Sequence, residues 1–149
     1  MPSESETAAI LTFTLGPQFY ALPIEDVVEV AAMVERVLLP DARPEILGVV
    51  NRRGAILPLV DLRLVFKQPA SPVTSATLFI VAQQDTKLVG LVVDEVQQVE
   101  YIPATKNAPT SGKIIRGIIS HKEQLIQIIS LPMIVATFLQ DELAIEGSS

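Results

Sequence analysis

The chain has 149 residues, which is enough for one domain or for two small subdomains that share a core. Its 17 acidic and 11 basic residues give a formal net charge of −6, which excludes a general electrostatic attraction to nucleic acid or to anionic lipid. With 49% hydrophobic residues the chain is too apolar for disorder, and the lack of cysteine excludes disulfides, thiolate nucleophiles and cysteine-based metal sites.

The amino-terminal part of the chain predicts two strands and one ambiguous segment. Residues 10–15 and 19–22 are expected to be a strand and its returning partner, joined by a turn at residues 16–18. Residues 24–30 mix helical and alternating apolar spacing, so helix and strand both stay open there. The acidic amino terminus has no signal-peptide pattern, and no run of about 18 apolar residues is present to cross a membrane.

A hairpin is predicted next, with strands at residues 46–50 and 55–60. Its turn, Asn51-Arg-Arg-Gly54, places Asn and Gly where positive φ angles are tolerated. Asp61 is the expected N-cap of a short helical turn that ends near Phe66. The arginines around the hairpin, which are Arg52, Arg53 and Arg63, fit either a small anion site or a solvated turn with a salt bridge to Asp61.

The second half of the chain follows a short connection at residues 67–75, which is rich in Pro and Ser. Residues 77–83 and 88–93 are expected to pair as strands. Residues 96–102 are expected to be a half-exposed strand, and residues 103–112 form the one long loop that the sequence predicts.

The hairpin returns as a degenerate copy about 69 positions later (117 − 48), because residues 46–62 align without a gap with residues 115–131 and Gly48 falls on Gly117. In the copy, Ser130 takes the place of Asp61 and is expected to cap a helix from Leu131 to about Gln140. Residues 120–123 have no glycine at the turn, so we expect function to differ between the two halves.

Many short strands, one helix at the end and an internal repeat predict an all-β fold of two small barrels lying side by side. We expect a single domain at residues 10–140, made of two intertwined barrel subdomains with the crossover near residues 67–76. Residues 1–9 and 141–149 are expected to be disordered tails.

Catalytic and metal motifs are missing from the sequence. It contains no phosphate loop, dinucleotide fingerprint, calcium loop or histidine zinc motif, so we predict no catalytic residue, metal or cofactor. An enzyme with an unrecognised site at Asp61, Asp94 and His121 stays open as an alternative, although capping and turn formation suffice for both aspartates.

Five strings in this order resemble the CheW family, and the resemblance covers roughly residues 10 to 140. Its specificity comes from an Asn-x-Arg-Gly turn, a following Leu-Pro-Leu-Val-Asp-Leu-Arg and a later Val-Gly-Leu-Val-Val-Asp. The strings are residues 13–15, 20–24, 27–30, 48–63 and 89–96.

The resemblance implies two five-stranded SH3-like barrels and a non-enzymatic, cytoplasmic adaptor. Such an adaptor couples a CheA-type histidine kinase, through its regulatory domain, to the coiled-coil tip of chemoreceptors, which are methyl-accepting chemotaxis proteins. It implies no nucleic acid partner, and association with membranes only through receptor arrays. Two alternatives remain: a small-ligand-binding β-barrel sensor, and an adaptor for a chemotaxis-like system that controls twitching or another output.

Carried over residue by residue, the resemblance places a receptor-binding groove at Ile24, Val27, Glu29, Arg53 and Val89. Arg53 is expected to order this groove by bonding the backbone or Glu29, against the alternative of a solvated turn arginine. From the residues alone, Ile24, Val27 and Val89 are equally well explained as core.

The kinase-binding face is expected near Leu39, Pro40 and Gly48. Arg52 departs from the family, which often has an apolar residue before the key arginine, so it is expected to affect the choice of partner.

Overall fold

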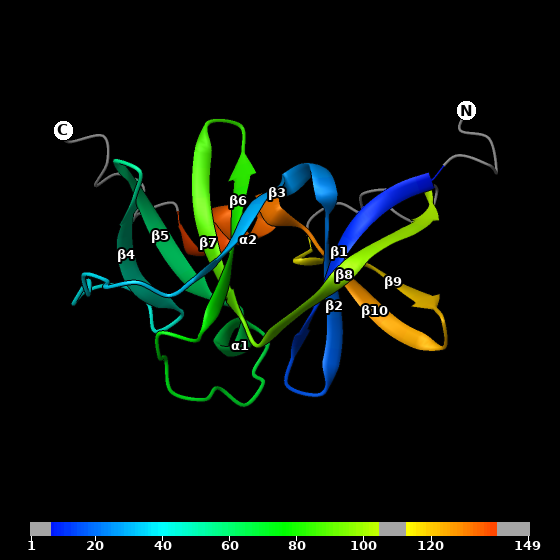
Figure 1. The fold of residues 1–149 in the computed structure, drawn as a ribbon, viewed down its shortest axis with the longest axis horizontal. Coiled ribbons are helices and arrows are strands. Elements are labelled where there is room, and N and C mark those ends of the chain that lie inside the picture. The colour runs from blue at the N-terminus through cyan, green and yellow to red at the C-terminus, as the bar shows by residue number, and fades with distance from the viewer. Residues whose placement is uncertain (1–6, 105–112, 140–149) are drawn as a thin grey trace.

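The structure is a computed structural model that describes residues 7–104 and 113–139. In these ranges the chain forms two five-stranded sheets that lie side by side (Figure 1). The predicted all-β pair of barrels is confirmed. No helix in the described ranges has the length and hydropathy that a membrane crossing needs.

Each barrel combines strands from both halves of the chain. The first barrel, in the spatial order β3-β6-β7-β5-β4, holds β3 (Val27–Ala32), β4 (Ile46–Arg52), β5 (Ala55–Asp61), β6 (Leu78–Gln84) and β7 (Lys87–Val93). The second barrel, in the order β8-β1-β2-β10-β9, holds β1 (Thr7–Leu15), β2 (Gln18–Pro23), β8 (Glu95–Pro103), β9 (Ile115–His121) and β10 (Gln124–Ile129).

The chain crosses between the barrels after β2 and again after β7 (Figure 1). The crossover predicted near residues 67–76 is therefore wrong. That connection joins the two copies of the repeat, but it runs from the helix after β5 to β6 within the first barrel.

The sequence repeat extends to the pairing of the strands. Gly48 lies opposite Leu59 in the β4–β5 pair, and Gly117 lies opposite Ile128 in the β9–β10 pair, with a bulge at the same place in both. The parallel contacts β5–β7 and β10–β2 correspond in the same way. The two barrels thus share one pairing scheme, related by the 69-residue offset.

Three apolar clusters fill the part of the molecule that the structure describes. A central core packs the two sheets against each other and includes Phe13, Leu22, Val60, Leu91 and the buried face of the last helix. Smaller clusters fill the first barrel and the second barrel. Because burial of apolar area is the main stabilising term, the central core fixes the two barrels as one body.

Two short helices begin where the sequence predicts. In α1 (Leu62–Val65), the Asp61 carboxylate accepts a hydrogen bond from the Arg63 backbone N–H at 3.0 Å. In α2 (Leu131–Phe138), Ser130 Oγ accepts from the Met133 N–H at 3.4 Å. Both predicted caps are confirmed.

Two boundaries differ from the predictions. The first strand begins at Thr7, so the last part of the predicted tail at residues 1–9 pairs with β8 instead. The ambiguous segment is a 3-10 turn, η1 (Ile24–Asp26), followed by the bulged strand β3, which explains its mixed spacing. The rest of both predicted tails, residues 1–6 and 141–149, and residues 105–112 of the predicted loop lie outside the described residues.

Candidate functional site

An ion pair between Glu29 and Arg52 joins the two edge strands of the first barrel, β3 and β4. Arg52 donates from Nε to Glu29 Oε2 at 3.0 Å and from Nη2 to Oε1. The side chain of Arg52 is 23% exposed and that of Glu29 is 26% exposed. Arg53 Nη1 lies 3.4 Å from Glu29 Oε2, but 77% of its side chain is exposed. Arg52 is therefore the main partner of Glu29, and Arg53 is its outer partner.

These contacts shift the titration of the groups involved. The hydrogen bonds from Arg52 lower the pKa of Glu29, and the charges of Arg52 and Arg53 lower it further. Glu29 in turn raises the pKa of Arg52. At neutral pH two guanidinium groups face one carboxylate, which leaves a local charge of about +1. The sequence predicted that Arg53 orders the groove. In the structure, Arg52 makes the closer contacts to Glu29.

The hairpin tip holds Arg53 in a left-handed conformation, with φ 55° at Arg53 and 85° at Gly54. Asn51 was expected at a position of positive φ, and this is wrong. Its side chain instead accepts a hydrogen bond from the Gly54 N–H at 3.0 Å. Glycine at position 54 suits the turn, whereas Arg53 occupies a conformation that non-glycine residues adopt less often.

The remaining residues of the predicted groove lie at different depths. Ile24 and Val27 are half-buried and pack on the central core. Val89 is only 1% exposed and belongs to that core, so its side chain is not available to a partner, and its assignment as a groove-lining residue is corrected. Two exposed residues of β3, Val28 and Val30, were missed, because apolar residues stand at both the half-buried and the exposed positions of this strand. We call Val28 and Val30, with the half-buried Ile24 and Val27, the β3 surface.

Of the predicted kinase-binding residues, only Pro40 is well exposed. Leu39 is half-buried against the central core. Gly48 is buried at φ 130°, and a Cβ built on it would collide with the backbone carbonyl of Val37. Its assignment as a contact residue is corrected, because the backbone of residue 37 covers it. Gly48 makes that close approach possible.

The segment around Val37, whose backbone lies close to Gly48, forms an apolar surface on β4. Val37 and Val49 exchange two backbone hydrogen bonds, at 2.8 and 2.9 Å. A depression of ≈ 360 Å³ lies beside them and is lined in part by the exposed Val37 and Ile56; Leu38, which follows Val37 in the chain, is also exposed. We call these three side chains with Val49 the β4 surface. Sequence reasoning missed Val37, Leu38 and Ile56, because nothing in the spacing shows which face of a curled edge strand meets solvent.

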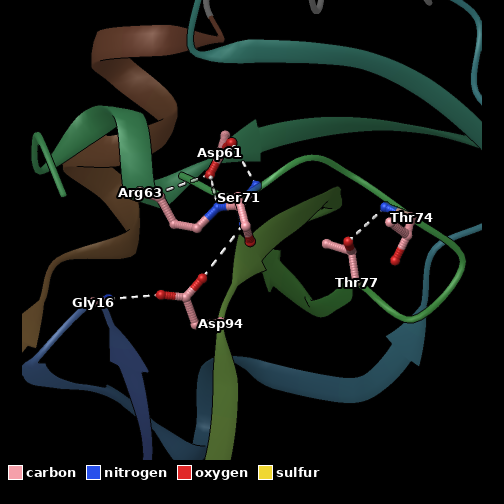
Figure 2. Close-up of polar contacts among 7 residues, drawn as sticks. All are labelled: Gly16, Asp61, Arg63, Ser71, Thr74, Thr77 and Asp94. Carbon is pink, nitrogen blue, oxygen red and sulfur yellow. Dashed lines mark hydrogen bonds and ion pairs between the residues drawn. The ribbon is translucent and has the colours of Figure 1, made fainter. Parts of the chain in front are cut away.

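Asp61 and Asp94, the candidate acid–base pair, are both bound by Arg63 (Figure 2). Arg63 is 2% exposed and contacts Asp61 Oδ1 at 2.9 Å, Asp94 Oδ1 at 3.4 Å and Ser71 Oγ at 3.3 Å. Asp94 Oδ2 accepts from the Gly16 N–H at 2.6 Å, which ties this cluster to the β1–β2 turn of the second barrel. The predicted salt bridge from Arg63 to Asp61 is confirmed, but the arginine is buried and not solvated, and it also contacts Asp94.

The third residue of the enzyme alternative, His121, lies in the second barrel. Its Nε2 contacts Glu100 Oε1 at 3.1 Å, and Lys122 Nζ lies 3.3 Å from the same oxygen. His121 therefore has different partners from Asp61 and Asp94, and the structure does not bring the three together. Within residues 7–104 and 113–139, no group of three or more His, Asp or Glu side chains is arranged to hold a metal ion.

Comparison with known proteins agrees with this architecture. The sequence model of the CheW-like domain matches residues 9–138. A protein of Rhizobium etli named "Probable chemotaxis protein CheW" is 34% identical over 131 residues, which cover 82% of this chain and 83% of that protein. "Chemotaxis protein CheW" of Helicobacter pylori is 24% identical over 136 residues, which cover 87% of this chain and 82% of that protein.

A solved structure gives the same result for the fold. The crystal structure of the scaffolding protein TtCheW from Thermoanaerobacter tengcongensis matches with a TM-score of 0.75 and 28% identity. The match covers 85% of this chain and 90% of that one. The sequence model, the relatives and the fold agree over nearly all of the described residues, and the chain belongs to the CheW-like domain family.

Proposed function

We propose that this chain is a non-enzymatic adaptor that couples a CheA-type histidine kinase to the coiled-coil tip of a chemoreceptor. The observation that carries the proposal is a pair of exposed apolar surfaces on the two edge strands of the first barrel, in a chain of the CheW-like family. The adaptor works in the cytoplasm and reaches the membrane only through its receptors. Its output is positional: it holds two partners so that the state of one shifts the equilibrium of the other.

The β3 surface suits the receptor. Val28 and Val30 are exposed aliphatic side chains, and they flank Glu29 at the charged seam of the barrel. A helix that docks through a stripe of apolar residues needs such aliphatic contacts, with charged groups beside them to set its orientation. Ile24 and Val27 lie beneath as half-buried support.

The β4 surface suits the kinase regulatory domain. The β4 surface is mostly apolar. The exposed Pro40 lies close to it in sequence, two residues after Leu38. Gly48 contributes by letting the backbone of residue 37 lie on β4. Exposed aliphatic residues gathered on one face are typical of protein contacts.

Calorimetric titration with two probes tests this proposal: the regulatory domain of a CheA kinase and the tip fragment of a chemoreceptor, both from the same genome. We expect Val30→Asp to lose binding of the tip fragment and keep binding of the kinase domain, and Ile56→Asp to do the reverse. Leu64→Asp, which changes a similarly exposed side chain on α1, is the matched control.

Binding of neither probe by the native chain would refute the adaptor. If Val30→Asp and Ile56→Asp each lose both partners while their unfolding midpoints stay native, the division into two surfaces is wrong. In both cases unfolding is measured first, so that loss of binding is not confused with loss of fold.

A further inference from the structure

We propose that Arg52 is a positioning residue for partner choice: by taking both oxygens of Glu29, it leaves Arg53 with one outer contact and an exposed side chain that binds a carboxylate on the docked helix. This inference deepens the proposed function and rests on it for the identity of the partner. It gives the departure from the family at position 52 a physical consequence, and it assigns Arg53 a partner outside the chain.

The first step is the saturation of Glu29. Both oxygens of its carboxylate accept hydrogen bonds from Arg52 in a bidentate arrangement. Such two-point pairs are the strongest form of the guanidinium–carboxylate contact. Arg53 contacts one of these oxygens at 3.4 Å, and 77% of its side chain is exposed.

The second step is that the backbone, rather than the choice of side chain, sets these two roles. His121 and Lys122 occupy the equivalent positions in the second barrel and share one oxygen of Glu100, although the residue equivalent to Glu29 at the 69-residue offset is Gln98. His121 is half-buried at the seam, while Lys122 is 70% exposed, at φ 52°, which is close to the value at Arg53. In both hairpins the residue before the tip points into the seam, and the tip residue points outward.

The third step is the chemistry of the partner. Two guanidinium groups against one carboxylate make this corner positive in a chain whose formal net charge is −6. Val28 and Val30, which precede and follow Glu29 on β3, are both exposed. A helix that lays an apolar stripe on these valines and carries Asp or Glu at the border of the stripe satisfies both features.

The fourth step is what happens without Arg52. An apolar residue at position 52 leaves both oxygens of Glu29 without their main donor. Arg53 is already 3.4 Å away, so it closes on Glu29 and forms the bidentate pair itself. Substitution of Arg52 therefore weakens partner binding by capturing Arg53, although Arg52 touches no partner.

The test uses calorimetric titration of a chemoreceptor tip fragment from the same genome into the native chain and four variants. Arg53→Ala and Arg52→Leu are each expected to weaken binding about tenfold, as the loss of one charge-assisted contact predicts. Adding Glu29→Gln to Arg52→Leu removes the group that captures Arg53, so this double variant is expected to recover native affinity. Lys122→Ala, at the equivalent tip of the second barrel, is expected to bind like the native chain.

Native affinity of Arg52→Leu, or failure of Glu29→Gln to rescue it, overturns the inference. A merely structural role for Arg52 predicts no rescue, because the double variant lacks the seam pair altogether. Replacing the acidic residues of the tip fragment by their amides is expected to abolish the difference between the native chain and Arg53→Ala. Persistence of that difference refutes the carboxylate partner.

A second readout separates this inference from the adaptor proposal. In NMR spectra of the arginine Nε–H groups, we expect the Arg52 proton to exchange slowly in the native chain, and the Arg53 proton to do so only in Arg52→Leu. If the native chain binds no tip fragment, the adaptor and the partner carboxylate both fall. If Arg53 holds the slow proton in the native chain, the role of Arg52 falls whether or not the tip fragment binds.

Discussion

Substitution of Gly48 by alanine should destabilise the fold far more than the same change at the equivalent Gly117. At Gly48 the backbone has φ 130°, and a Cβ would collide with the Val37 carbonyl oxygen and lie 3.1 Å from its carbon. The positive φ costs a residue with a Cβ about 1–3 kcal/mol. Moving residue 37 away breaks two backbone hydrogen bonds with Val49, worth about 1 kcal/mol each. The sum is about 3–5 kcal/mol.

Gly117 is the internal control. It takes the same place in the second barrel, but its φ is outside the left-handed region, and a Cβ there would meet no described atom within 4 Å. We expect Gly117→Ala to change the free energy of unfolding by less than about 0.5 kcal/mol. Urea unfolding followed by circular dichroism measures both variants. Equal losses at the two sites, or a neutral Gly48→Ala, would refute the close approach of residue 37 as the reason for this glycine.

Three further predictions concern charged groups. Arg63→Met should lower the free energy of unfolding by about 3–5 kcal/mol, because it leaves the Asp61 carboxylate buried without its counter-charge; urea unfolding at pH 7 measures this. Burial raises the pKa of Asp26, so its charge destabilises the fold above that pKa; Asp26→Asn should therefore raise the melting temperature at pH 7, and the gain should vanish below about pH 4. Hydrogen bonds from Arg52 lower the pKa of Glu29, so the ionised Glu29 stabilises the fold above about pH 4.5, and this stabilisation is lost as the pH falls further. Glu29→Gln should therefore reduce the fall in melting temperature between pH 6 and pH 3, which melting curves recorded over this range measure.

The sequence was sufficient to predict the two-barrel fold because its signals were local and occurred twice. The hairpin around Gly54 and its copy aligned without a gap, and both helix caps, Asp61 and Ser130, stood at the same offset. Neither signal shows how strands from the two copies are exchanged. The strand order of each sheet in the structure was therefore needed to place the crossovers after β2 and after β7.

The candidate site was harder to predict because it depends on contacts distant in sequence. One partner of the buried Arg63 is Asp94, which lies 31 positions further along the chain, and no local pattern around residues 61–63 predicts that partner. Val89 and Val30 are both valines on strands, yet the first lies in the central core and the second faces solvent. Which face of a strand is covered depends on where the other barrel sits, and alternation alone does not give that position.

The repeat shows where the functional difference between the barrels must come from. The hairpins of the two barrels have the same strand register and the same bulge, so these two features do not distinguish their partners. The seam residues differ: Arg52 pairs with Glu29 in the first barrel, and His121 contacts Glu100 in the second. At the tips, Gly54 follows Arg53 whereas Glu123 follows Lys122, so the residue after the outward cation is acidic only in the second barrel. A partner that brings a carboxylate therefore meets two guanidinium groups against one carboxylate at the first barrel and an additional acidic residue at the tip of the second, and this contrast directs such a partner to the first barrel.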